Sequence, residues 1–387
     1  MPLSSRPPSR RSAIAPFHAM AVLAAANALD AAGRRIMHME IGEPGAPTPD
    51  IVREAARAAL EGGRIRYTDA LGWRPLRERI ALHYRERYGV DVDPGRVVVT
   101  TGSSGGFNLA FLAAFDAGDR VAIATPGYPA YANILRALDL EVVELRTRAE
   151  DRHAITPALV EAAHAQKPLA GLIVASPANP TGTMTTPDAL AELIAVASDL
   201  GIRFVSDEIY HGLVYQGTAA TALARSEETI VVNSFSKYYC MTGWRVGWMV
   251  LPPSLVRSVE RLGQNLYICA PDLSQRAALV AFDATADLER IREGYAANRK
   301  LLLERLPQIG FDEIFPADGA FYIYASSRRF TNDSADFARR MLHEAGVAAT
   351  PGMDFDRENG SAYIRFSFAG STDDIDEASR RIADWLR

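Results

Sequence analysis

After Pro47, short apolar runs alternate along the chain with longer segments that have helical periodicity. Helices are predicted at Phe107–Phe115, Tyr131–Leu138 and Pro187–Leu200, between the apolar runs. This alternation predicts an α/β fold in which a mostly parallel sheet carries helices on both faces. The last two strands are joined by one short turn and are the expected exception to the parallel arrangement. The six predicted strands are Val97–Thr101, Val121–Ala124, Leu172–Ala175, Arg203–Ser206, Ile230–Asn233 and Val246–Leu251.

The pattern changes near Asp287, where a long helical stretch begins and continues through Glu304. Beyond this helix, Pro316–Tyr324 and Ala362–Ser367 have the pattern of strands. Together these segments predict a smaller α+β unit beside the main sheet.

The N-terminal segment combines a polar arm with an apolar stretch. Residues 1–15 are rich in Ser, Pro and Arg and are expected to form a flexible arm. Two arginines followed by the Ala-rich stretch 13–32 loosely resemble a signal peptide, but a proline and several polar residues interrupt that stretch. We therefore prefer an amphipathic helix from about Ala19 to Ala32, ended by Gly33.

Composition restricts the functional classes. The 387 residues, 48% of them hydrophobic, are enough for one large and one small domain. A net charge of −5 lacks the basic excess typical of nucleic-acid binding. The two cysteines, Cys240 and Cys269, make no disulfide framework, which favours the cytoplasm. No spacing resembles a zinc site, and no apolar run reaches the roughly 20 residues of a membrane span. We expect a cytoplasmic enzyme without a metal, nucleic-acid or membrane partner.

A lone lysine in a Ser-rich turn is the strongest chemical signal. The turn reads Ser234-Phe-Ser-Lys237 and continues to Gly243-Trp-Arg245-Val-Gly247 after a predicted strand. A lysine amine condenses with an aldehyde cofactor, while Ser and Arg side chains bind the cofactor's phosphate. A surface lysine is the alternative for Lys237 taken alone. The pattern S-x-S-K followed by G-x-R-x-G resembles that of the class I/II aminotransferases, which are fold-type I enzymes that use pyridoxal phosphate.

The resemblance covers the chain from about residue 16 to the C-terminus and implies two domains. It places a large cofactor-binding domain at 46–285 and builds a small domain from both chain ends, 16–45 and 286–387. Pyridoxal 5′-phosphate is the implied cofactor, held as a Schiff base by Lys237, which then moves a proton between the substrate and cofactor carbons. Nearby cations and burial are expected to lower the pKa of Lys237.

Other predicted strand ends carry further polar features, and ligands of open parallel sheets bind at that edge. The Gly/Ser-rich segment Thr101–Gly106 precedes a helix, whose free N–H groups suit a phosphate, although an ordinary turn is the alternative. The resemblance adds Ser103, Ser104, Ser234 and Arg245 to the phosphate site. It also places Tyr128 on the pyridine ring, with plain packing as the alternative.

Two more strand ends match family signatures. By resemblance, Asn179 in Asn-Pro-Thr-Gly donates a hydrogen bond to the phenolic oxygen of the cofactor, although such a segment is also a common loop. Asp207 is implied to pair with the pyridine nitrogen, with a helix N-cap as the alternative, and Tyr210 to bind the same phenolic oxygen as Asn179. Ile209 would pack under the ring, and Glu208 would be structural or solvent-facing. The implied catalytic residues are Lys237, Asp207 and Tyr210.

The resemblance also implies residues that bind substrate. Arg365 is implied to grip the substrate α-carboxylate, with a solvent-facing arginine as the alternative, and Gly42 lies in a turn that approaches the same group. Phe17 and Phe321 are expected near the substrate side chain. Tyr67 resembles a tyrosine that reaches the phosphate of a neighbouring subunit, which implies a homodimer with shared sites.

These features predict a transaminase that works by a ping-pong mechanism. Ser104 stands where one dicarboxylate-specific subgroup of the family carries a lysine. We therefore expect a neutral donor (alanine, a branched-chain or an aromatic amino acid) and an acceptor such as 2-oxoglutarate or pyruvate. Three alternatives stay open: an aspartate:2-oxoglutarate aminotransferase, another fold-type I enzyme such as a carbon–sulfur lyase, and a non-catalytic regulator that binds the cofactor.

Overall fold

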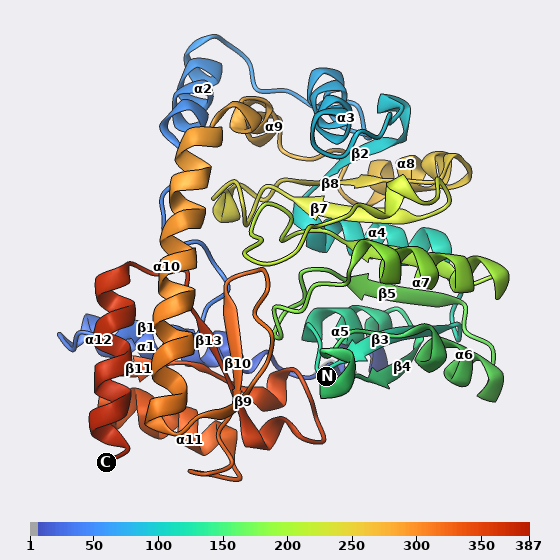
Figure 1. The fold of residues 1–387 in the computed structure, drawn as a ribbon. Helices are drawn as coiled ribbons and strands as arrows, with labels where there is room; N and C mark the ends of the chain where they lie inside the picture. The colour runs from blue at the N-terminus through green and yellow to red at the C-terminus, as the bar shows by residue number, and fades with distance from the viewer. Residues whose placement is uncertain (1–6) are drawn as a thin grey trace, which may run out of the picture.

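The computed structural model describes residues 7–387 and contains a large central sheet (Figure 1). Its seven strands lie in the order β2-β8-β7-β6-β5-β3-β4. Only β8 runs antiparallel to its neighbours, so the mostly parallel sheet and its expected exception are both confirmed. The strands are β2 (Val97–Thr100), β3 (Arg120–Thr125), β4 (Glu141–Arg146), β5 (Gly171–Ala175), β6 (Arg203–Asp207), β7 (Ile230–Ser234) and β8 (Gly247–Val250).

Helices cover both faces of this sheet because alternate strand residues point to opposite sides. Along β2, Val98 packs toward one face, whereas Val97 and Val99 pack toward the other. The first face is covered by α4 (Gly102–Ala114), α5 (Pro129–Ala137) and α8 (Pro253–Leu266). The second face is covered by α2 (Asp50–Glu61), α3 (Arg74–Tyr88), α6 (Pro157–Gln166), α7 (Pro187–Asp199) and α9 (Asp272–Leu279).

A smaller α+β unit is built from both chain ends. Its four-stranded antiparallel sheet has the order β12-β13-β10-β9, and β1 pairs in parallel with β11. The strands are β1 (Met37–His38), β9 (Asp312–Ile314), β10 (Tyr322–Ser326), β11 (Val347–Ala348), β12 (Thr350–Pro351) and β13 (Tyr363–Ser367). The helices are α1 (His18–Ala31), α10 (Thr285–Ile309), α11 (Ser334–Arg340) and α12 (Thr372–Trp385).

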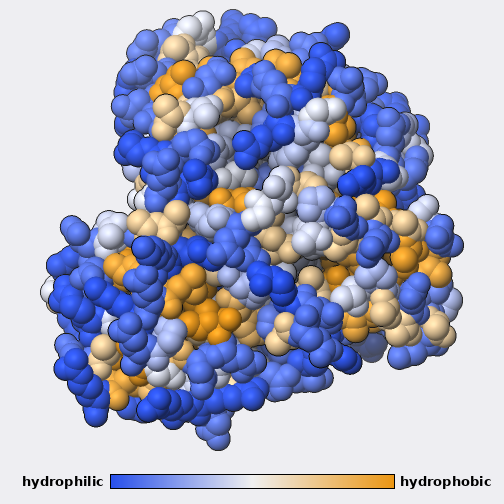
Figure 2. Space-filling view, viewed as in Figure 1, coloured by the Kyte–Doolittle hydropathy of each residue, from blue (hydrophilic) through white to orange (hydrophobic). Residues whose placement is uncertain are grey.

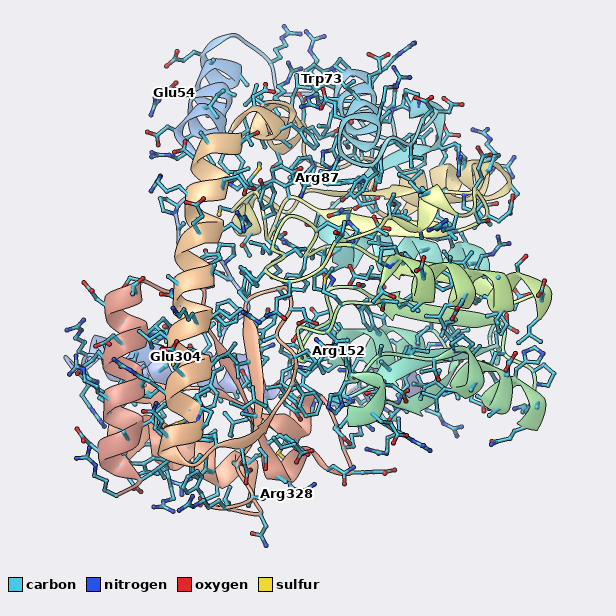
Figure 3. All side chains as sticks on the ribbon, in the orientation of Figure 1. Glu54, Trp73, Arg87, Arg152, Glu304 and Arg328 are labelled. Carbon is cyan, nitrogen blue, oxygen red and sulfur yellow. The ribbon has the colours of Figure 1, made fainter. Side chains whose placement is uncertain are left out.

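Contacts from distant parts of the sequence join the two units. Arg152, labelled in Figure 3, pairs with the buried Asp318 at 2.7 Å, and Arg146 pairs with Asp356 at 3.0 Å. Figure 1 shows α10 running from beside α2 and α9 down to the smaller unit. This architecture agrees with two domains, while the boundaries at 45/46 and 285/286 stay a prediction.

Two predicted elements begin at other residues in the structure, and one strand was not predicted. The helix expected from Phe107 begins at Gly102, so the Gly/Ser-rich segment forms its first turns. The strand expected over Pro316–Tyr324 begins only at Tyr322, because the preceding segment bonds instead to the loops of the large unit. Strand β4 was not predicted, since its outward positions are polar on an edge strand.

At the N-terminus, the expected arm falls partly on residues 1–6, which lie outside the described part of the chain. Residues 10–12 form a short 3-10 helix, and Arg11 pairs with Asp139 at 3.0 Å.

No helix within residues 7–387 combines the length and apolar character needed to cross a membrane. Figure 2 shows mainly hydrophilic residues on one face, with apolar residues in small groups between them.

Candidate active site

A cavity of about 480 Å³ lies where the carboxyl ends of β5, β6 and β7 meet the smaller unit. Twelve of the residues expected at the site line it: Phe17, Gly42, Ser103, Ser104, Tyr128, Asn179, Asp207, Ile209, Tyr210, Lys237, Arg245 and Arg365. The edge where parallel strands end therefore collects side chains that are far apart in the sequence. Further lining residues include Met20, Glu43, Phe107, Tyr131, Ser236, Thr242 and Tyr322.

Lys237 reaches the cavity from the turn after β7. Its Nζ donates a hydrogen bond to the carbonyl oxygen of Gly42, in the N-terminal turn of the smaller unit. Burial of the amine, reinforced by the charges of Arg365 and Arg245, lowers the pKa of Lys237 to about 8. The direction expected from the sequence is confirmed. A pKa near 8 leaves a useful fraction of the amine neutral and nucleophilic at neutral pH.

In the cofactor-free protein, Lys237 is expected to react with an amine-directed acylating reagent at a rate that titrates near pH 8. The chain has only two other lysines, Lys167 and Lys300, and both side chains are mostly exposed. Peptide mapping of the label against pH tests this expectation. A Lys237 rate that keeps rising in step with the exposed lysines up to pH 10 would contradict it.

Asp207 ends β6 with a buried carboxylate. Tyr131 donates a hydrogen bond to Oδ2, and the backbone N–H of Ile209 donates to Oδ1 at 3.0 Å. Burial raises the pKa of Asp207 to about 6, against the lowering effect of these two bonds and of Lys237. At pH 7 the group is mainly a carboxylate with little solvent, which suits it to bind a cationic group of a ligand.

The first turn of α4 offers hydrogen-bond donors that suit an anion. The N–H groups of this turn are free of intrahelical partners, and Ser103, Ser104, Ser236 and Arg245 line the adjoining wall of the cavity. The Ser234 hydroxyl instead lies buried against Ser236 Oγ at 2.9 Å and the Val246 carbonyl at 3.2 Å. Of the two serines in the lysine turn, Ser236 lines the cavity, and Ser234 supports it from behind.

Glycines let the chain segments of this site approach each other. A Cβ on Gly247 would lie 2.8 Å from the Asn233 carbonyl and 3.0 Å from the Ser103 nitrogen. A Cβ on Gly102, whose φ is +72°, would lie 2.5 Å from Arg245 Nη2. The second glycine of the Gly-x-Arg-x-Gly pattern thus permits contact between the lysine turn and α4.

Gly247→Ala is expected to weaken phosphate binding roughly 10- to 100-fold, because the added carbon pushes backbone segments of the anion site apart. Gly243→Ala is the matched control: it lies in the same turn, its φ is ordinary, and nothing lies within 4 Å of its Cβ position. Titration of each variant with pyridoxal phosphate, the cofactor that the sequence resemblance implies, gives the comparison. Equal affinities of the two variants would contradict this account of Gly247.

Arg365 lies on β13 and is 2% exposed. Its Nη1 donates to Asn179 Oδ1 at 3.0 Å, and its guanidinium carbon lies 4.3 Å from the Tyr322 ring centre. The Tyr322 hydroxyl is 2.8 Å from the Tyr210 hydroxyl, so the two tyrosines join β10 to the turn after β6. The solvent-facing alternative for Arg365 is wrong.

Phe321 does not line the cavity. It is 0% exposed and packs edge-on to Tyr210, with ring centres 5.5 Å apart. Its neighbour Tyr322 takes the cavity side, because adjacent residues of an extended segment point in opposite directions. Phe17 does line the cavity. Its ring packs edge-on to that of Tyr128, with ring centres 6.1 Å apart.

Tyr67 is 79% exposed and lies outside this chain's own cavity.

Glu208 is buried, so its solvent-facing interpretation is wrong. Its Oε1 accepts hydrogen bonds from the Ser206 and Thr221 hydroxyls and from the Ala222 N–H, which makes it structural.

Ten lining residues were not predicted from the sequence, and three of them, Tyr131, Ser236 and Tyr322, are hydrogen-bonded to predicted site residues. Tyr131 lies in the first turn of α5, three residues after Tyr128 at the helix N-cap, and the two ring centres are 5.3 Å apart; this short spacing offered a usable signal. Ser236 sits inside the quoted lysine motif. Tyr322 gave no signal, because only the register of β10 decides which of two adjacent aromatics faces the cavity.

Known proteins resemble this chain over nearly its whole length. A family model described as aminotransferase class I and II matches residues 34–382. The chain is 49% identical to a valine–pyruvate aminotransferase of Mycobacterium tuberculosis, over 97% of each chain. A crystal structure of an aminotransferase from the same species superposes with a TM-score of 0.96, 48% identity and 99% coverage of both chains. An aspartate aminotransferase from Thermus thermophilus with maleate gives a TM-score of 0.92 at 32% identity, covering 98% of this chain and all of that one.

Proposed function

Because the chain belongs to the class I and II aminotransferases, we propose that it moves the amino group of a neutral L-amino acid to a 2-oxo acid, with pyruvate as the first candidate acceptor. It is a transaminase of fold type I that uses pyridoxal phosphate. Valine–pyruvate transamination by its relative from Mycobacterium tuberculosis supports this choice of substrates.

The residues of the cavity suit this cofactor. The first turn of α4 with Ser103, Ser104, Ser236 and Arg245 offers N–H, hydroxyl and guanidinium donors for a phosphate. Asp207 offers a buried negative charge for the pyridine nitrogen, and Tyr128 and Ile209 offer surfaces for the ring. Asn179 and Tyr210 offer donors for its phenolic oxygen. When bound, the cofactor supplies an aldehyde that accepts the amino group and a ring that takes up the electron pair released at the substrate α-carbon.

Each catalytic side chain then has a distinct task. Arg365 binds the substrate carboxylate and orients the α-carbon toward Lys237. Lys237, with its pKa lowered to about 8, takes a proton from that carbon in its neutral form and returns a proton as the cation. Asp207 keeps its negative charge at neutral pH and so favours a protonated ring nitrogen. The amino group of the first substrate stays on the loaded enzyme after the first product leaves, so the two substrates use the same Arg365 in turn with ping-pong kinetics.

The small number of cationic side chains at the cavity supports the preference for neutral amino acids. Among the described residues that line it, the cationic side chains are Lys237, Arg245 and Arg365, and each already has a role. Residues 7–387 therefore supply no further cation at the cavity for a second substrate carboxylate. Phe17 and Met20 offer apolar surface at the same cavity, which suits a branched aliphatic side chain.

A half-reaction screen tests the proposal. The protein loaded with cofactor is mixed with single amino acids, and the loss of the aldehyde absorbance is followed. We expect valine and other neutral donors to react at least about tenfold more efficiently than aspartate, and pyruvate to restore the starting spectrum. Faster conversion by aspartate would overturn the substrate preference. Release of ammonia or sulfide without an amino-group acceptor would favour a lyase.

We also propose that two copies of the chain share their sites through Tyr67. Its segment is held to the start of α9 and to the loop before it: the Arg66 N–H donates to Asp272 at 3.0 Å, and the Thr68 N–H lies 3.4 Å from Cys269 Sγ. Exposed apolar side chains in this region are Ile65 and Tyr67 on the segment itself, Leu266 at the end of α8 and Ile268 in the loop after α8. A second copy would remove this apolar surface from water.

Mixed dimers test the sharing of sites. Tyr67→Ala and Lys237→Ala are each expected to impair the enzyme. If Tyr67 acts across the interface, a hybrid of the two chains has one site with both residues intact, and activity rises on mixing. If mixed chains that form hybrids show no gain, or if the protein sediments as a monomer, the proposal is wrong.

A further inference from the structure

A buried acidic side chain lies behind the substrate-binding arginine. Glu40 follows β1 and is 0% exposed, yet it does not line the cavity. Its Oε1 lies 2.8 Å from His38 Nδ1, and its Oε2 has no hydrogen-bond partner among the described residues. A carboxylate removed from water needs a cation nearby, and His38 is the group in contact with it.

His38 is held from both sides by carboxylates. Its Nε2 lies 2.7 Å from Asp30 Oδ2, near the end of α1, opposite the contact with Glu40. The hydrogen bond to Glu40 raises the pKa of His38 to about 9, and Asp30 adds to the effect. Asp374 of α12 also faces this site and pairs with Arg35 at 3.0 Å. Figure 1 shows α1, β1, β11 and α12 together at the lower left.

The main chain of Glu40 connects this cluster to the site. Its carbonyl oxygen accepts a hydrogen bond from Arg365 Nη2 at 2.6 Å and another from Thr350 Oγ1 at 2.6 Å. Arg365 Nη2 also contacts Thr350 Oγ1 at 3.1 Å, while Nη1 contacts Asn179. The orientation of the guanidinium therefore depends on where the Glu40 carbonyl stands.

We propose that the His38–Glu40 ion pair is a positioning device for Arg365 and so sets the affinity for the substrate carboxylate. A charged His38 fixes the Glu40 side chain, and the Glu40 carbonyl then holds one arm of the guanidinium. This inference rests on the proposed role of Arg365. The competing account is that backbone bonds alone hold this segment, through Met39 N to Ala348 O at 2.9 Å and Ser367 N to Met39 O at 2.7 Å.

The test compares KM with kcat for a 2-oxo acid acceptor, which carries a carboxylate but no amine. His38→Gln and Glu40→Gln are each expected to raise KM roughly tenfold and to leave kcat within about twofold. Asp374→Asn is the matched control, because it removes a neighbouring exposed charge that does not bond to His38. Calorimetric binding of an unreactive monocarboxylate to each variant gives the same comparison without turnover.

The pH dependence separates positioning from folding. In the unaltered enzyme, KM for the oxo acid is expected to rise as the pH passes about 9, because His38 then loses the charge that balances Glu40. The ratio of KM values at pH 9.5 and pH 7.5 should be smaller in His38→Gln. This measurement does not depend on whether Glu40→Gln folds.

The KM of a further variant, Arg365→Lys, separates failure of this inference from failure of the proposed role of Arg365. If this substitution leaves KM unchanged, the proposed role of Arg365 fails, and this inference fails with it. If it raises KM while His38→Gln behaves like Asp374→Asn at every pH, the backbone alone positions Arg365 and only this inference is overturned. A lower melting temperature with unchanged KM would show that the ion pair serves stability alone.

Discussion

Lys237→Ala is expected to lower kcat for transamination by about 10⁴-fold or more, because the variant loses both the amine that binds the cofactor and the group that moves the proton. No other lysine lines the cavity among the described residues, so no side chain stands ready to replace it. The measurement is single-turnover conversion of the loaded enzyme by its best amino-acid donor. Folding is checked by the melting temperature of the apoprotein.

The small number of lysines makes the control direct. Lys167→Ala and Lys300→Ala remove exposed amines that do not line the cavity and are expected to leave kcat within about twofold. Borohydride reduction of the loaded protein makes the bond between cofactor and lysine permanent. Peptide mapping should then find the added mass on Lys237. A label on either of the other lysines, or a Lys237→Ala variant with normal turnover, would refute the assignment.

Asp207→Asn is expected to lower kcat/KM by about 10²–10⁴-fold, which corresponds to the roughly 3–5 kcal/mol lost when one partner of a buried ion pair is removed. The carboxylate is 3% exposed, and its side-chain partner from the protein is Tyr131. Asparagine preserves the size of the group and removes its charge. The readouts are kcat/KM and the absorbance of the bound cofactor against pH, which reports the proton on its ring.

Two comparisons separate the charge of Asp207 from its surroundings. Tyr131→Phe removes one hydrogen bond and keeps the charge, so a loss of only about tenfold is expected. Glu208 is the next residue, and burial raises its pKa to about 8, so it is largely neutral at pH 7. Glu208→Gln should therefore change kcat/KM by less than about threefold. If Asp207→Asn lowered kcat/KM no more than Glu208→Gln does, the charge of Asp207 would have no role in catalysis.

The sequence placed the sheet, and with it most of the candidate site. Alternating apolar runs and helical segments predicted a parallel sheet, and the polar residues after those runs had to gather at one edge because parallel strands end there together. Asn179, Asp207 and Lys237 were located this way, with motif resemblance supplying their roles. Helix starts were less certain: the Gly/Ser-rich segment looked like a turn, yet its free N–H groups belong to α4 itself.

Contacts between residues that are far apart in the sequence could not be predicted from the sequence alone. Arg365 meets Asn179 across 186 residues, and this contact depends on how the smaller unit docks on the large one. The same docking brings the Glu40 carbonyl to Arg365 and the Gly42 carbonyl to Lys237.

The sequence by itself determined the α/β class, the lysine chemistry and the set of polar groups at the strand ends, because local periodicity and motif spacing are properties of neighbouring residues. Only the tertiary structure decided that Tyr322 rather than Phe321 faces the cavity, that Ser236 rather than Ser234 lines it, and that His38 and Glu40 stand behind Arg365. A shift of one residue in strand register reverses which side chain points inward, and packing of the whole molecule fixes that register.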